Sequence, residues 1–109
     1  MAAVTHYSAH TGTHEGKHYK TTLFEGSHLM VGVNCLEPGQ EQPVHAHEGA
    51  DKFYVVMEGK GEFSIGERTY DAAEGSVVWA PAGVPHGVRN TARGAARLRV
   101  RGAADRPPQ

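Results

Sequence analysis

Val-His-Ala-His at positions 44–47 places two histidines one residue apart, between Pro-Gly at 38–39 and the strand-like run Lys-Phe-Tyr-Val-Val-Met at 52–57. Side chains on an extended backbone alternate between its two faces, so the imidazoles of His45 and His47 share a face. Imidazoles are good ligands for divalent transition metals, and two on one face are half of a site. The stretch therefore predicts a strand that carries part of a metal centre.

A second stretch supplies a third histidine. Residues 75–90 read Gly-Ser-Val-Val-Trp-Ala-Pro-Ala-Gly-Val-Pro-His-Gly-Val-Arg-Asn. This order is typical of a strand, a tight proline-bounded turn and another strand, with His86 at the start of the latter. Three neutral imidazoles would form an open face on a metal ion and leave positions for water, substrate or dioxygen.

The two stretches together resemble the cupin family. Its first motif has a glycine, two histidines, a glutamate and a second glycine, and its second has Gly, Pro, Gly, His and Asn at fixed spacing. The positions that match are Gly39, His45, His47, Gly59, Gly75, Pro81, Gly83, His86 and Asn90. The resemblance spans roughly residues 28–101. It implies an all-β fold, a small antiparallel β-barrel or jelly roll, whose lumen holds one divalent metal bound by His45, His47 and His86.

The sequence departs from the family at the glutamate of the first motif. Lys52 occupies that position, and Asp51 precedes it. Asp51 could ligate the metal if a bulge turned it inward, and Glu48 is a weaker candidate. Without either residue, the site has three imidazole ligands and no carboxylate.

Lys52 and Tyr54 share a face of their strand and point into the lumen if the register follows the cupin pattern. Lys52 would pair with a nearby acid (Asp51, Glu41 or Glu62) or bind an anionic substrate, unless its stem merely covers apolar surface. Tyr54 would hydrogen-bond a substrate oxygen or donate a proton, unless it only packs in the core with its hydroxyl satisfied. These two residues are the candidate catalytic groups.

A three-histidine site without a carboxylate is similar to those of thiol dioxygenase and diketone-cleaving cupins. The resemblance therefore implies a metal-dependent enzyme of the dioxygenase type, acting on a small organic substrate in the barrel lumen. The alternatives are a metal-dependent isomerase, cyclase or lyase, a non-catalytic module that binds a small molecule or metal, and a metal-free barrel whose histidines do acid–base chemistry. Iron, manganese, nickel, copper and zinc all accept imidazole, so the native metal stays open.

Length and composition bound the setting in which this site works. At 109 residues the chain is expected to form one domain, and its net charge of -1 gives no case for a nucleic acid or membrane partner. The lone Cys35 excludes an internal disulfide, and no signal peptide or membrane-spanning stretch is visible, so a cytoplasmic location is expected. The small core and an exposed arm favour a homodimer, and Trp79 could pack against a second sheet or lie at the dimer contact.

Short runs separated by turn residues predict an antiparallel barrel by pattern alone. The expected strands cover residues 18–24, 28–36, 44–47, 52–58, 62–65, 68–71, 76–80, 86–90 and 96–101. Residues 1–18 are expected to be a polar arm, residues 19–102 the barrel, and residues 103–109 a flexible tail. The arm carries four histidines, which are interpreted as lying on a solvated or edge-strand segment, with a second metal site as the alternative.

Alternation within the strands predicts which side chains face the lumen. The candidates beside the ligands are Gln42, Tyr54, Val56, Val78, Val88 and Met30, and Trp79 is expected on the opposite face from Val78. In the last expected strand, Arg97, Arg99 and Arg101 share one face. This row is interpreted as a solvated face or an edge guarded by charge, with a substrate phosphate or an acidic partner as the alternative.

Overall fold

The computed structural model describes residues 3–46, 48–92 and 98–105, and almost all of the regular structure in them is β. One short 3-10 helix precedes the strands. The elements are η1 (Tyr7–His10), β1 (Tyr19–Glu25), β2 (Leu29–Leu36), β3 (Glu41–His45), β4 (Lys52–Glu58), β5 (Lys60–Ile65), β6 (Arg68–Ala73), β7 (Val77–Ala80), β8 (His86–Arg89) and β9 (Leu98–Asp105). Within these residues no helix is long and apolar enough to cross a bilayer.

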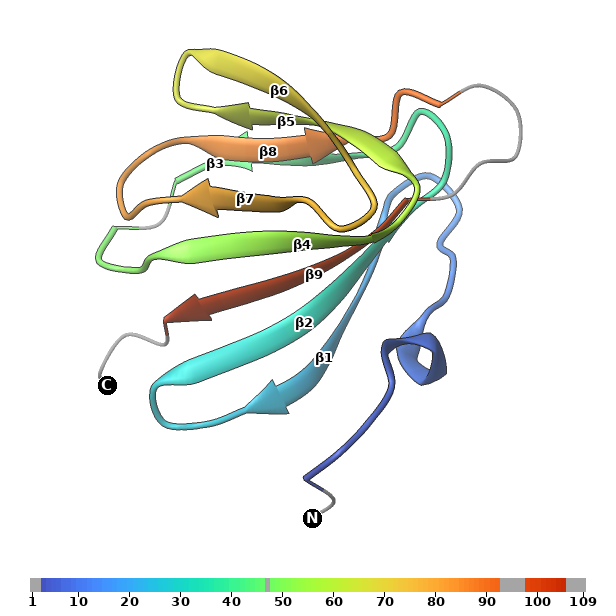
Figure 1. Ribbon diagram of the computed structural model, residues 1–109, viewed down its shortest axis with the longest axis vertical. Helices are drawn as coiled ribbons and strands as arrows, with labels where there is room; N and C mark the ends of the chain where they lie inside the picture. The colour runs from blue at the N-terminus through green and yellow to red at the C-terminus, as the bar shows by residue number, and fades with distance from the viewer. Residues whose placement is uncertain (1–2, 47, 93–97, 106–109) are drawn as a thin grey trace.

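The strands form two antiparallel sheets, which confirms the predicted all-β fold. The larger sheet has the order β1-β2-β9-β4-β7, and the smaller has the order β3-β8-β5-β6. In Figure 1 the smaller sheet occupies the upper part of the molecule, and β9, β2 and β1 run below β4. The larger sheet joins strands from both ends of the chain, so the site residues on β3, β4 and β8 are brought together from well-separated segments.

The core lies between the sheets and follows the two-residue period of the strands. Its members are Leu36, Tyr54, Val56, Phe63, Ala72, Val78, Ala80 and Val88. On β7 the alternation is sharp, since Val78 is 9% exposed while Val77 is 67% and Trp79 is 55% exposed. The predicted opposition of Val78 and Trp79 is therefore confirmed. Met30 is 39% exposed, so its predicted lumen position is wrong: only residues 33–36 of β2 are buried.

Residues 81–84 of the second motif form a tight turn between β7 and β8. The Val84 N–H donates to the Pro81 carbonyl at 3.1 Å, and Gly83, at the third position of this turn, has φ of +77°. A positive φ at that position is typical of a type II turn and favours glycine. The turn fixes where β8 begins, and β8 begins at His86.

Asn90 closes the second motif by tying three segments together. Its buried side chain donates from Nδ2 to the Leu36 carbonyl at 2.9 Å and accepts from the Ala92 N–H at 3.0 Å. Its backbone N–H donates to the Gln40 carbonyl at 3.0 Å. The motif asparagine thus holds the end of β8 against the end of β2 and the approach to β3.

The last strand differs from the prediction in two ways. β9 ends at Asp105, so residues 103–105 belong to the barrel and not to a flexible tail. It also lies between β2 and β4, with Ala103 opposite Val31 on one side and Phe53 on the other. Pairing on both sides satisfies the backbone of the small residues 102–104 and outweighs their low strand propensity. The proposed edge role of the arginine row is therefore wrong; residues 97 and 106–109 lie outside the described residues.

The N-terminal arm is irregular apart from η1. The His6 side chain accepts from the Ser8 N–H at 3.2 Å and caps η1. Further along, Gln40 Nε2 donates to the His14 carbonyl at 2.8 Å, so the arm is fastened to its own barrel. In residues 3–18, no three histidines or acids gather into a metal-binding group.

Candidate metal centre

A β-bulge in β3 brings the first site residues onto one face. Gln42 pairs with Val88 and His45 with His86, so Pro43 and Val44 together stand opposite the single residue Gly87. Strict alternation would put positions 42 and 45 on opposite faces, and the extra residue of the bulge cancels that difference. Proline suits this place because it has no N–H to contribute to the ladder.

Gly87 makes room for the bulge. A Cβ at this position would lie 2.9 Å from the Gln42 carbonyl oxygen and 3.0 Å from the Val44 backbone nitrogen. Neither of these backbone atoms can move without shifting β3. The absence of a side chain at Gly87 therefore sets the close approach of β3 to β8, and with it the spacing of the two paired histidines.

His45 and His86 form an imidazole pair at one end of the barrel. Their ring centroids are 4.5 Å apart with an interplanar angle of 58°, and His86 is 2% exposed. His45 Nδ1 lies 2.8 Å from the Pro43 carbonyl oxygen, and His86 Nδ1 lies 3.1 Å from the Val84 carbonyl oxygen. A carbonyl can only accept, so in each neutral ring Nδ1 carries the proton and Nε2 carries the lone pair. This is the arrangement of a metal-ligating histidine, whose other nitrogen is held by the backbone.

Tyr54 lies beside this pair and is fully buried. Its hydroxyl donates to Gln42 Oε1 at 2.8 Å, and its ring meets the His86 ring edge-on with centroids 6.1 Å apart. Burial raises the pKa of the Tyr54 hydroxyl, so the group stays neutral at ordinary pH. The hydroxyl is therefore engaged by Gln42, and the ring forms the wall against which His86 rests.

Lys52 occupies the lumen face next to Tyr54, as the sequence predicts. Its Nζ lies 4.7 Å from the centroid of the Tyr54 ring, an arrangement in which the ring face attracts the ammonium. Burial, and then the positive charge of Lys20, lowers the pKa of Lys52 to about 8. The Tyr54 ring is thus in contact with both the half-buried amine of Lys52 and the imidazole of His86.

Asp51 has a different place in the structure from the histidine pair. Its Oδ1 accepts from the Ala82 N–H at 2.9 Å, so the carboxylate fastens the turn that presents the Val84 carbonyl to His86. Among the described residues, no three histidine, cysteine or acidic side chains form a metal-binding group, so Asp51 does not join His45 and His86. His47 lies outside the described residues, and its role as a ligand stays a prediction.

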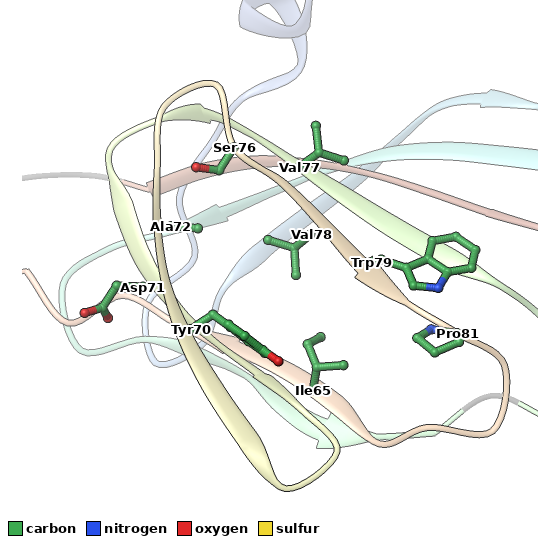
Figure 2. Close-up of a pocket in the computed structure, with 9 residues that line it drawn as sticks. All are labelled: Ile65, Tyr70, Asp71, Ala72, Ser76, Val77, Val78, Trp79 and Pro81. Carbon is green, nitrogen blue, oxygen red and sulfur yellow. The ribbon is translucent and has the colours of Figure 1, made fainter.

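A separate groove runs between the edge strands β6 and β7. It has a volume of about 550 Å³ and is lined mainly by apolar side chains of β6, β7 and their neighbours, including Tyr70 and Trp79. Figure 2 shows Tyr70 and Ile65 on one side of the groove, and Val78 and Trp79 on the other. Asp71 and Ser76 supply its polar side chains. None of the histidine-pair residues lines this groove.

The comparisons with known proteins agree with the motifs. A family model described as "Cupin domain" matches residues 32–100. This chain belongs to the cupin family. The structure of a Thermus thermophilus protein, TT1209, is similar to this cupin with a TM-score of 0.89 and 34% identity, over 97% of this chain and 100% of that one. An RmlC-like cupin from Desulfovibrio desulfuricans gives a TM-score of 0.81 and 28% identity, over 100% and 99% of the two chains.

A curated sequence relative adds no activity. An uncharacterized protein from Streptomyces coelicolor is 36% identical over 58 residues, which are 53% of this cupin and 54% of that protein. The chain spans about half the length of the curated relatives it matches. These likenesses establish the family and the fold, and the activity has to be argued from the site.

Sequence reasoning missed three contributors to the site. Gly87 and Pro43 set the bulge, and both carry a signal, since a glycine or proline inside a strand pattern marks a bulge or a close backbone approach. Lys20 of β1 adds its charge to the surroundings of Lys52. Nothing in the local sequence of β1 relates it to β4, because two other strands separate them in the sheet.

Proposed function

We propose that this cupin binds one divalent transition metal through His45, His47 and His86 and uses it as an enzyme of the dioxygenase type on a small organic substrate. The observation that carries the proposal is the anchored imidazole pair, in which both Nδ1 atoms meet backbone carbonyls. This donor set fits a metal such as iron, manganese, nickel, copper or zinc. His47 enters through its alternation with His45 and its place in the first motif.

The surrounding residues have separate tasks in this proposal. The turn fastened by Asp51 and the bulge opposite Gly87 hold the two histidines in place before any ligand arrives, which is the support that metal ligands need. Tyr54 and Gln42 close the wall behind His86 with a satisfied hydrogen bond. When bound, the metal would supply a Lewis acid with open positions for substrate and dioxygen.

A metal-dependent isomerase, cyclase or lyase is the second candidate, and one observation favours it. The pKa of Lys52, lowered to about 8, would let its amine accept a proton near neutral pH. A non-catalytic binding module would use the same residues without turnover.

Elemental analysis of protein purified without added metal tests the metal proposal. We expect about one equivalent of a transition metal per chain in the wild type and almost none in His86→Ala. The matched control is His28→Ala, which removes an exposed histidine between β1 and β2 and should leave the metal in place. Iron or copper would favour dioxygen chemistry, checked by oxygen uptake, whereas zinc or nickel would favour the Lewis-acid candidate. A wild type that carries no metal and binds none on titration would overturn the proposal.

We also propose a cytoplasmic location. Cys35 is a free thiol that is 1% exposed, and a protein without disulfides fits a reducing compartment. Cell fractionation checks this, and recovery outside the cytoplasm would contradict it.

A further inference from the structure

Lys52 brings a positive charge into the barrel beside the histidine pair. Its side chain is half-buried, lies over the Tyr54 ring, and comes from the position at which the cupin motif expects a glutamate. A buried charge is costly unless an opposite charge or hydrogen bonds compensate for it. The ring face of Tyr54 gives part of that compensation, but it carries no negative charge.

The acids that the sequence offers to Lys52 are engaged or placed elsewhere. Asp51 accepts from the Ala82 N–H, and Glu62 forms an ion pair with Arg89 at 3.3 Å. Glu41 is exposed at the start of β3. Among the acids of residues 3–46 and 48–92, none forms an ion pair with Lys52.

Two other basic residues interact electrostatically with Lys52: Lys20 of β1, and His18, which precedes β1. The charge of Lys20 opposes that of Lys52. Burial lowers the pKa of His18, a hydrogen bond with the Glu41 backbone raises it, and the charges of Lys20, Lys17 and Lys52 lower it further. The half-buried Lys52 of β4 and the exposed Lys20 of β1 therefore contribute positive charge to the same end of the larger sheet. Such a concentration of one sign of charge attracts a ligand of the opposite sign.

We propose that Lys52 forms an anion-binding subsite in this barrel, and that the ligand is a small organic carboxylate. The carboxylate of the ligand would then stand where the family motif has a carboxylate of its own. The assignment of this carboxylate as the substrate of the metal site rests on the proposed function. Anion binding itself requires only the basic side chains, so it can be measured in the absence of metal.

Binding of malonate to chelator-treated protein, followed by calorimetry and ligand-observed NMR, tests the inference. We expect malonate to bind the wild type, and its neutral diamide, malonamide, not to bind. Lys52→Met should weaken malonate binding at least tenfold, whereas Lys60→Met, at an exposed lysine of β5, should leave it unchanged. Lys52→Arg should retain binding, since arginine keeps the charge but cannot serve as a base. Circular dichroism checks that each variant is folded.

The outcomes separate this inference from the metal proposal. Equal binding by wild type and Lys52→Met, or equal binding of malonate and malonamide, would overturn the anion subsite even if the metal is present and lost in His86→Ala. Binding of inorganic phosphate but not of malonate would overturn the carboxylate assignment. If the wild type binds no metal but still binds malonate through Lys52, the subsite stands and the metal proposal fails.

Discussion

Two regions of the barrel have opposite character, the histidine end between β3, β4 and β8 and the groove between β6 and β7. At the histidine end, the polar side-chain atoms are fixed by named partners: both Nδ1 atoms by backbone carbonyls, and the buried Tyr54 hydroxyl by Gln42. The groove is large and mainly apolar, and its aromatic residues are about half exposed, Tyr70 at 47% and Trp79 at 55%. The groove is therefore separate from the histidines that could hold a metal.

The contrast shows what preorganises a site. A groove needs only that two sheet edges stay apart, whereas a ligand set needs a bulge, a close backbone approach and a fastened turn to act together. Changes at the histidine end should therefore affect stability and metal binding together, while changes at the exposed side chains of the groove should affect neither.

Gly87→Ala should give the largest effect and would break the histidine end specifically. The added Cβ would meet the backbone of Gln42 and Val44 at 2.9–3.0 Å, so β3 must move away from β8. We expect a loss of about 2 to 3 kcal/mol in the free energy of unfolding and metal affinity about tenfold weaker or worse. Urea unfolding and metal titration measure the two quantities.

Gly26→Ala is the matched control for this change, because its Cβ would meet nothing closer than the Leu29 carbonyl oxygen at 3.6 Å. If Gly87→Ala behaves like Gly26→Ala, the close approach of the two strands does not hold the site.

The pH dependence of stability tests the histidine end further, with an expected effect of intermediate size. The pKa of Lys52 is about 8 in the folded protein, against an ordinary value of 10.5, so between these values the unfolded chain binds more protons. The free energy of unfolding of ligand-free protein should therefore rise with pH from about 8 to 10.5, by about 1 to 2 kcal/mol after allowance for solvent screening. Below pH 8 the amine is charged in both states, and the full cost of burying it is present.

Urea unfolding at a series of pH values checks this. Lys52→Met should be more stable than the wild type at pH 7 and should lose this part of the rise, whereas Lys60→Met should keep it. If the free energy of unfolding of Lys52→Met rises with pH by the same amount as that of the wild type, groups other than Lys52 cause the rise.

Trp79→Ser should have the smallest effect and tests the groove. Because Trp79 is more than half exposed and lines no part of the histidine end, we expect a change within about 0.5 kcal/mol and an unchanged metal content. The homodimer expected from the sequence, with Trp79 at its contact, predicts that this variant sediments as a monomer. Loss of metal in Trp79→Ser would show that the groove and the histidine end act as one functional unit.

Much of the barrel could be predicted from sequence because its strands alternate and its motifs have fixed spacing. Periodicity placed β4 and β7 to within a residue and identified Tyr54, Val56, Val78 and Val88 as inward-facing, and all four are buried. Gln42, also predicted to face the lumen, is buried because of the bulge in β3. The motifs brought His45 and His86 together, and they are directly paired across β3 and β8.

The remainder depended on contacts between distant segments. The sequence pattern ends the last strand at residue 101, because the small residues that follow have low strand propensity. Only the pairing of β9 with β2 and β4 shows that the strand continues to Asp105. The motif makes Asp51 a candidate ligand if a bulge turns it inward, and only the structure shows that its Oδ1 accepts from a backbone N–H in a turn far along the chain. The electrostatic influence of Lys20 on Lys52 likewise depends on the strand order of the larger sheet, which no local pattern encodes.

The central place of β9 has a consequence for synthesis on the ribosome. β2 ends at Leu36, yet the strand that joins it to β4 begins only at Leu98. At roughly 5 to 20 residues per second, β2 waits about 3 to 12 s for the partner between it and β4, and β4 waits for a shorter time. During that interval each presents an unpaired backbone edge, the kind of surface that nascent-chain chaperones shield and that neighbouring chains can capture. Released chains that stop before residue 98 should therefore be sensitive to protease, and the released chain that contains β9 should be resistant.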